Sequence, residues 1–414
     1  MTGLTELYRG GIGMLEAWNE QLEKMYEKMV EWRRHFHQYP ELTNQEYKTS
    51  KMIADILTDF GIDIRTNVGS MGVLGYINGA KPGKTIALRA DFDALPIQDE
   101  KEVPYKSKID GVMHACGHDG HTATLLAVGK VLYDNRDSLA GKVVLLFQHA
   151  EEGGGGAKQM IEDNCLAGVD LVFANHLWSL YPTGEISFTK GYTTAAGDGF
   201  SIKIKGKGGH GSSPHDTVDS IAIAGALINQ LQYIVSRRVH PQKTAVLTIG
   251  SIHAGNAANV IADSALMKGT VRTYEKEVQQ LVKEAMEDTI KGICTSQKAD
   301  YEFKYHFGMP AVYNHPAETD IFRNAIASAL PEIILNEVPP LLVSEDFALY
   351  LEDIPGMLFF TGAGNEEIKA VYPHHHPKFD FDEKAMLTSG KAMLAIIDYY
   401  LAGKTSDNKA ITMK

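Results

Sequence analysis

The chain has 414 residues, of which 44% are hydrophobic and 22% charged, so it is long enough for a large core and for two domains. Its formal net charge of −12 disfavours a nucleic-acid partner or an anionic membrane surface, because such contacts usually need a basic face. Only three cysteines occur, which argues against a disulfide framework and predicts a cytoplasmic location, and no apolar run has the length of a membrane span.

The first segment predicts a helix that ends before Pro40. Apolar residues recur there at alternating steps of three and four from Leu15 to Phe36, a pattern that favours core or subunit packing over ligand binding. Thr43 and Glu46 then have the spacing of a capping box, which predicts that a second helix begins here and runs to Gly61.

Strand-like and helical runs alternate in the next part of the chain. The strand-like runs are Thr85–Arg89, Lys142–Gln148 and Val169–Asn175, and the helical runs are His121–Asn135 and Ala157–Asn164. This alternation predicts an α/β domain with a mixed, largely parallel sheet and helices on both faces. Functional residues of such sheets collect beyond the carboxyl ends of the strands.

The middle of the chain has a different pattern, β-α-β-β-α-β, which is the order of a ferredoxin-like α+β unit. Its elements are expected at Phe200–Lys205, Val218–Arg238, Thr244–His253, Ala265–Thr273, Val278–Thr295 and Tyr301–Phe307. The pattern predicts a complete domain inserted at residues 187–308. The surrounding domain would then be discontinuous and comprise residues 1–186 and 309–414, with a final helix at Glu383–Leu401.

The densest polar cluster is the sequence HACGHDGH, which begins at His114. In a loop, the spacing of Cys116 and His118 lets a thiolate and an imidazole converge on one metal ion. A polar turn before a helix is the alternative. One such cluster alone does not decide between the two.

Glu151 and Glu152 follow a buried strand. Adjacent carboxylates at this position need a cation or a proton to offset their charge. Their side chains diverge, so one can bind metal while the other acts as a general base, although two solvated loop acids would show the same sequence. The glycines that follow lack the ending of a phosphate-binding loop.

His176 follows the third strand, and the triplet His374–His376 lies far along the chain. Each fits a structural histidine when taken singly. Together, one cysteine, at least three histidines and a carboxylate at successive strand ends predict a metal centre of zinc, manganese or cobalt rather than calcium or magnesium. A thiolate can bridge two such ions, and a bridged pair can polarise a carbonyl and activate water.

With these motifs the chain resembles the aminoacylase/carboxypeptidase-like amidohydrolases, which are dinuclear metallopeptidases. The family includes hippurate hydrolase, N-acyl-amino-acid amidohydrolases, aminobenzoyl-glutamate hydrolase and the auxin-conjugate hydrolases. The resemblance runs from Trp32 to Leu401. Its motifs, in order, are HACGHDGH, the Glu pair after FQHA, NHLW, GKGGHGSSPH, NVIAD, GTVRT, SEDF and HHHPKFDFDE.

The resemblance implies two divalent metal ions per chain, Mn²⁺, Zn²⁺ or Co²⁺. It implies Glu151 as the general base and acid, and Asp91 as an acid behind the metal ligands. The ligands that it implies are Cys116, as the bridge, with His118, Glu152, His176 and His375. His375 is taken from the triplet because it lies four residues before Phe379, where the family's ligand falls.

The resemblance also makes the inserted domain a lid and dimerisation domain. His210 matches a histidine that reaches the partner subunit's active site, and Asn259 and Arg272 match residues that hold the substrate's carboxylate. A homodimer or a higher homo-oligomer is therefore expected, with no nucleic-acid or membrane partner.

The implied reaction hydrolyses the amide bond of an N-acyl amino acid with metal-activated water, which releases a free amino acid and a carboxylic acid. A dipeptidase or carboxypeptidase with the same site, acting on dipeptide-like substrates, is the first alternative. A non-catalytic metal-binding paralogue is the second, and Glu151 counts against it because the metals do not need that residue.

Three positions depart from the family pattern. His149 and Ala262 stand where proline is usual, and His376 with Pro377 makes the last loop more basic and stiffer. These departures bear on the identity of the substrate and leave the hydrolytic residues unchanged.

Overall fold

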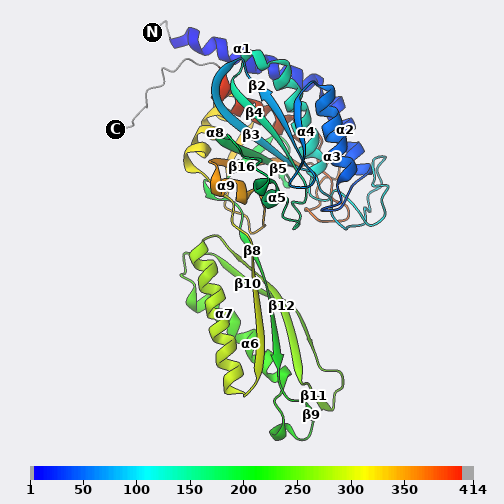
Figure 1. Cartoon of the computed structure of the whole chain (residues 1–414), viewed down its shortest axis with the longest axis vertical. Helices are drawn as coiled ribbons and strands as arrows, with labels where there is room; N and C mark the ends of the chain where they lie inside the picture. The colour runs from blue at the N-terminus through cyan, green and yellow to red at the C-terminus, as the bar shows by residue number, and fades with distance from the viewer. Residues whose placement is uncertain (1–3, 403–414) are drawn as a thin grey trace. The chain divides into compact units, whose positions relative to one another are not determined.

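The computed structural model describes the backbone of residues 4–402 and the side chains of residues 13–402. Two compact units make up this part of the chain (Figure 1). The first contains the described residues up to Gly191, the segment Tyr313–Pro339 and the residues from Leu349 onward. The second contains Tyr192–Val312 and Pro340–Ala348.

The first unit is built on an eight-stranded mixed sheet. In spatial order its strands are β1 (Asp63–Val68), β2 (Gly72–Asn78), β4 (Ala140–Gln148), β3 (Lys81–Asp91), β5 (Leu171–Pro182), β16 (Gly356–Gly364), β6 (Glu185–Phe188) and β15 (Ile334–Glu337). The four central strands β4, β3, β5 and β16 are parallel, whereas β2 and β6 run antiparallel to the centre. This architecture confirms the predicted α/β class with a mixed, largely parallel sheet.

Helices pack against this sheet and against one another, and most of them contribute to a continuous apolar core. They are α1 (Leu4–Lys24), α2 (Tyr26–Gln38), α3 (Tyr47–Asp59), α4 (His118–Asp134), α5 (Gly156–Glu162), α8 (Pro316–Ala329), α9 (Ala348–Asp353) and α10 (Ala385–Leu401), with a 3₁₀ turn at Arg136–Ser138. The apolar stripe lies in this core, with Trp18, Trp32 and Phe36 almost fully buried. The stripe is divided between α1 and α2, where a single helix was predicted.

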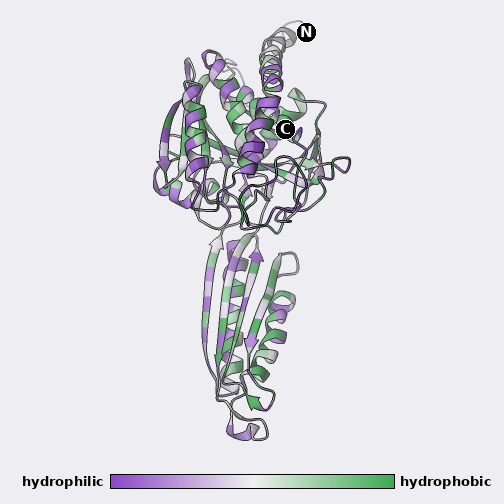
Figure 2. Ribbon diagram, turned by 90° about the vertical axis from the view of Figure 1, so that its right-hand side faces the viewer, coloured by the Kyte–Doolittle hydropathy of each residue, from purple (hydrophilic) through white to green (hydrophobic). Residues whose placement is uncertain are grey.

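The second unit is an antiparallel sheet with the order β10-β12-β8-β13. Its elements are β8 (Ala196–Lys205), α6 (Ser220–Tyr233), β10 (Ala245–Ala254), β12 (Ser264–Thr273), α7 (Lys276–Ser296) and β13 (Asp300–Met309), in the β-α-β-β-α-β order expected from the sequence. Buried and solvent-facing residues alternate along β8, and Figure 2 shows this alternation as bands along the strands.

Short elements complete the chain. A ribbon of β9 (Gly209–His210) and β11 (Val260–Ile261) extends the second unit, which also has helical turns at Pro214–Asp216 and Ile234–Arg238. The two-residue strands β7 (Gly191–Tyr192) and β14 (Tyr313–Asn314) lie where the chain passes from one unit to the other. Within the described residues, no helix combines the length and the apolar character needed to cross a membrane.

The predicted capping box of Thr43 and Glu46 is wrong. Helix α3 begins at Tyr47, and neither side chain caps it. The Glu41 carboxylate does so instead, because it accepts hydrogen bonds from the backbone N–H groups of Lys48 (3.2 Å) and Thr49 (2.8 Å). Sequence spacing alone could not distinguish the two arrangements, since both use a carboxylate near the first turn.

Candidate metal centre

The predicted metal ligands come from loops at one edge of the large sheet. β3, β4 and β5 are parallel, so the segments that follow them meet at their common carboxyl ends. The loop after β3 leads to Cys116 and to His118 at the start of α4. Glu152 follows β4, His176 lies within β5, and His375 belongs to the long segment after β16.

Two groups of ligand atoms share Cys116. Cys116, His118 and His176 form one group, and Cys116, Glu152 and His375 form the other, with the ligand atoms of each within 4.8 Å of one another. The Cys116 Sγ lies 3.5 Å from His176 Nε2, and His375 Nε2 lies 3.1 Å from Glu152 Oε1. The two groups therefore have the thiol of Cys116 in common.

Hydrogen bonds turn the imidazoles of this cluster inward. His118 Nδ1 lies 3.0 Å from the Asp93 carbonyl oxygen, and His176 Nδ1 lies 2.8 Å from the Leu177 carbonyl oxygen. A carbonyl only accepts, so both rings donate from Nδ1, and Nε2 is the atom that would bind a metal. His118 Nε2 is buried and has no hydrogen-bond partner among the described residues, as expected of a ligand atom.

Of the triplet, His375 is the member that belongs to a candidate ligand group among the described residues. His375 has a left-handed backbone, with φ 64°, and its N–H donates to the Ala115 carbonyl oxygen over 2.8 Å. The ring of His374 stacks on Trp178, with centroids 4.3 Å apart. His376 stacks on Tyr372 in the same way, at 4.5 Å. The two flanking histidines therefore have structural contacts of their own.

Asp91 lies behind the cluster and has a buried cation as its partner. Arg89 Nη1 donates to one oxygen over 2.6 Å, and His121 Nδ1 lies 2.6 Å from the other. His121 Nε2 accepts from the Leu177 N–H, so both of its nitrogens are occupied. Burial alone would raise the pKa of Asp91, but Arg89 and then His118 hold it well below its usual range.

The cluster carries an excess of negative charge. Burial, followed by the carboxylates of Glu152, Glu151 and Asp91, raises the pKa of the Cys116 thiol well above its usual value. Burial alone would lower the pKa of His118, yet Asp91 and then Asp93 raise it to about 10. Divalent cations would offset this charge, and the thiol, imidazole and carboxylate donors fit zinc, manganese or cobalt.

Glu151 lies beside the ligands, and its carboxylate also forms a candidate group with His118 and Glu152, whose ligand atoms lie within 4.8 Å of one another. Its Oε2 is 4.0 Å from His118 Nε2. His149, one of the departures from the family pattern, is buried two residues earlier. Its Nε2 lies 3.2 Å from Gln159 Oε1, and His149 belongs to none of the ligand groups among the described residues.

A buried charge network that the sequence analysis missed supports two of the ligand loops. Arg33 of α2 is fully buried and donates to Asp119 (3.0 Å), Asp380 (2.6 Å) and Glu383 (3.1 Å). Asp119 is next to His118, and Asp380 lies in the loop that carries His375. Arg33 therefore connects α2 to two loops that hold predicted ligands.

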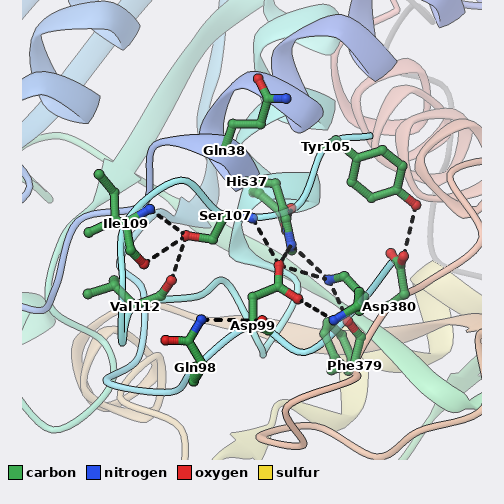
Figure 3. A network of polar contacts seen from close by, with 12 residues as sticks. His37, Gln38, Gln98, Asp99, Tyr105, Ser107, Ile109, Val112, Phe379 and Asp380 are labelled. Atoms are coloured by element: carbon green, nitrogen blue, oxygen red, sulfur yellow. Dashed lines mark hydrogen bonds and ion pairs between the residues drawn. The ribbon is translucent and has the colours of Figure 1, made fainter. Parts of the chain in front are cut away.

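The same network continues around His37 (Figure 3). His37 Nδ1 lies 2.7 Å from Asp119 Oδ2, and its Nε2 lies 3.3 Å from Asp99 Oδ2. The Lys101 ammonium donates to His37 Nε2 (2.8 Å) and to the Phe379 carbonyl oxygen (2.8 Å). The four-residue spacing of Arg33 and His37 on the buried face of a helix was the only signal in the sequence.

The second unit carries the other three predicted site residues, and it does not bring them together. His210 on β9 is adjacent to Asn259, because the Gly211 N–H donates to the Asn259 carbonyl oxygen (2.9 Å). Arg272 on β12 instead pairs with Gly197 at the start of β8, whereas His210 follows the end of β8. Eight residues of strand separate the two ends, a distance of about 26 Å.

Comparisons with known proteins identify the family of the chain. Residues 87–399 match the model of Peptidase family M20/M25/M40. A Bacillus subtilis (strain 168) protein named "Putative amidohydrolase YhaA" is 52% identical over 386 residues, which cover 92% of this chain and 97% of that protein. The N-acetyl-L-cysteine deacetylase of the same organism is 42% identical over 366 residues, 88% of this chain and 86% of that protein.

Solved structures agree as well. The Bacillus subtilis YXEP protein, described as a dinuclear metal binding peptidase from the M20 family, superposes with a TM-score of 0.80 at 36% identity. The match covers 91% of this chain and 98% of that one. With the clustered ligand atoms and the matched family model, these likenesses show that the chain belongs to peptidase family M20/M25/M40 and is a metal-dependent amidohydrolase.

Proposed function

We propose that the chain deacylates N-acyl amino acids, releasing a free amino acid and a carboxylic acid. The observation that carries the proposal is the position of Glu151, a half-buried carboxylate whose Oε2 lies 4.0 Å from His118 Nε2. It stands outside the two groups that share Cys116, and its carboxylate lies close to further possible ligands, His118 with Glu152 on one side and Glu345 with Asp346 on the other. The names of relatives support the acyl amino acid as substrate, since one of them is an N-acetyl-L-cysteine deacetylase.

In this proposal Cys116, His118, Glu152, His176 and His375 hold two divalent ions, Mn²⁺, Zn²⁺ or Co²⁺. When bound, such ions polarise the substrate carbonyl and lower the pKa of water. Glu151 accepts the proton of the attacking water and then donates it to the leaving amine. Asp91 orients the histidines behind the ligands through its contact with His121.

We further propose that residues 187–308 act as a lid and dimerisation domain within a catalytic domain of residues 1–186 and 309–414. The separation within the second unit supports a homodimer. His210 and Asn259 lie together beyond the far end of β8, and the strand alone spans about 26 Å from the level of Arg272 to that end. This separation is too large for one copy of the unit to present all three residues to a small substrate. His210 and Asn259 of one subunit would then act with Arg272 of its partner.

The subunit exchange has a direct test. A His210→Ala chain mixed with a Glu151→Gln chain should regain activity, because one site of the heterodimer then has every residue intact. Each variant incubated alone is the control. Absence of recovery after verified subunit exchange would contradict a role for His210 across the interface.

The substrate proposal is tested with N-acetyl, N-benzoyl and N-indoleacetyl amino acids and with dipeptides, each assayed after chelation and reloading with manganese, zinc or cobalt. We expect the acyl amino acids to be cleaved fastest, and only by reloaded protein. Preferential cleavage of dipeptides would favour the peptidase alternative. Metal binding without any turnover would favour a non-catalytic paralogue. The cytoplasmic location stays a prediction.

A further inference from the structure

The turn that presents Glu151 contains a backbone conformation that needs support. Ala150 is fully buried and has φ 54°, a left-handed conformation that residues other than glycine rarely adopt. Such a conformation persists only where the surrounding structure holds it in place. The direction of the Glu151 side chain depends on this turn, because the next backbone bonds start from Ala150.

Two buried carboxylates hold the turn from either side of Glu151. Glu46 Oε1 accepts a hydrogen bond from the Ala150 N–H (2.8 Å), and Asp93 Oδ2 accepts one from the Glu152 N–H (2.9 Å). Asp93 is supported in turn by Thr43, whose hydroxyl donates to the same oxygen over 2.7 Å. The segment Thr43–Glu46 therefore fixes both backbone N–H groups that flank Glu151.

The same segment also packs against the glycine loop that follows the turn. A Cβ atom on Gly154 would lie 2.4 Å from Thr43 Cγ2, 2.7 Å from Asn44 Nδ2 and 2.7 Å from Ala150 Cβ. No side chain fits in that space, so the two loops are in direct contact. This packing contact is separate from the hydrogen bonds, and it also joins the segment Thr43–Glu46 to the turn that carries Glu151.

Glu46 is a buried carboxyl group whose hydrogen-bond partner from outside its own turn is Ala150. Its side chain is fully buried, does not cap α3, and its Oε2 has no hydrogen-bond partner among the described residues. A buried carboxyl group that is only partly hydrogen-bonded destabilises a fold. Burial, followed by the charge of Asp93, raises the pKa of Glu46 to about 7, which reflects that cost.

We propose that Thr43 and Glu46 are positioning residues that brace the turn at Ala150 and so aim Glu151 at the reacting atoms. The proposal rests on the proposed role of Glu151 as general base. Neither residue touches the ligand groups, so both act through the backbone of the turn and through Asp93.

The first test compares Glu46→Ala with Glu46→Gln. Glutamine keeps an acceptor oxygen for the Ala150 N–H, whereas alanine removes it. We expect Glu46→Ala to lower kcat at least tenfold with KM within threefold of wild type, because a misdirected base slows the chemical step more than binding. Glu46→Gln should stay within threefold of the wild-type kcat. A Glu46→Ala kcat within twofold of wild type would overturn the proposal, as would equal losses for the two variants.

A matched control separates bracing from general destabilisation. Ser50 lies on α3, the helix that directly follows Glu46. Its buried hydroxyl donates to the Met71 carbonyl oxygen over 2.6 Å, so this hydrogen bond does not involve the turn at Ala150. Ser50→Ala should lower Tm but keep kcat within twofold. If Ser50→Ala lowered kcat as much as Glu46→Ala at the same Tm, bracing would be refuted.

Thr43→Val gives a second arm that needs no substrate. Asp93 also lies 3.2 Å from His118 Nδ1, so loss of the Thr43 hydroxyl should loosen both Glu152 and His118. We expect calorimetric Co²⁺ affinity to fall about tenfold, in the range found for groups that orient metal ligands. Unchanged affinity would overturn the role of Thr43. If none of the substrates in the panel were cleaved, the proposed deacylation would be refuted. The Co²⁺ affinity of Thr43→Val would still test the positioning role of Thr43, because that measurement needs no substrate.

Discussion

Replacement of Arg33 by methionine should destabilise the fold far more than the same replacement of its neighbour Arg34. Arg33 has no exposed surface and pairs with three carboxylates. The Arg34 side chain is 46% exposed, pairs with the carboxylate of Glu383 and lies over the Tyr105 ring. Removal of one partner from a buried ion pair costs about 3–5 kcal/mol, and loss of an exposed pair costs about 0–1 kcal/mol. The two adjacent arginines are therefore an internal comparison.

The partners that remain place the Arg33 effect at the lower end of that range. After the change, Asp119 keeps His37 at 2.7 Å, Asp380 keeps Tyr105 at 2.8 Å, and Glu383 keeps Arg34. We therefore expect a loss of about 3 kcal/mol for Arg33→Met and below about 1 kcal/mol for Arg34→Met.

Urea unfolding of the metal-free chain is the appropriate assay, because bound metal would add its own stabilisation. The pH dependence gives a further check. Burial raises the pKa of Asp119, but Arg33 and then His37 hold it well below its usual range. The stabilisation from this pair is therefore complete above about pH 4 and is lost as the pH falls through the lower folded pKa. Equal losses for the two variants at pH 7 would refute the reasoning.

Three further predictions follow from the site. Glu151→Gln should retain its metal and lose about a hundredfold or more in kcat, and near-normal turnover by a metal-loaded variant would assign the base elsewhere. Arg272→Ala should lower kcat/KM by about 2–4 kcal/mol of transition-state stabilisation, and should no longer distinguish a substrate carboxylate from its amide, which paired assays measure. Glu46 has a pKa of about 7 in the fold against an ordinary value of 4.5, so its stabilisation is lost as the pH rises through 7. Relative to Glu46→Gln, the wild-type free energy of unfolding should fall by about 1.4 kcal/mol per pH unit between pH 4.5 and pH 7. Urea unfolding at a series of pH values measures this, and the same pH dependence in both proteins would contradict the raised pKa.

The carboxyl-end cluster could be predicted because parallel strands align their ends. Once the strands before Asp91, Glu151 and His176 were recognised, their convergence followed from topology. The choice of His375 from its triplet could not be made from the residues alone, since it depends on a left-handed backbone at that position and on stacking of the flanking rings.

The contacts of Thr43, Glu46 and Arg33 could not be predicted from the sequence, for a different reason. Thr43 and Glu46 match a capping box, and only the tertiary structure shows that Glu41 caps the helix while Glu46 binds the Ala150 N–H and Thr43 binds Asp93. The burial of Arg33 was also not predicted, because an arginine on an amphipathic helix is usually solvated. Its three carboxylate partners come from segments 86, 347 and 350 residues away.

The antiparallel sheet of the second unit has a consequence for how this chain can diverge. Arg272 pairs at the start of β8, and His210 follows the end of this strand. The number of residues in β8 therefore sets the distance between these two positions. Inserting one residue would turn every later side chain to the opposite face, and inserting two would restore the face but add about 6.6 Å. Substitutions along the outer face of β8 are therefore tolerated more readily than changes in its length. In related sequences we expect substitutions on the outer face of β8, and insertions in the loops beyond the ends of the strand.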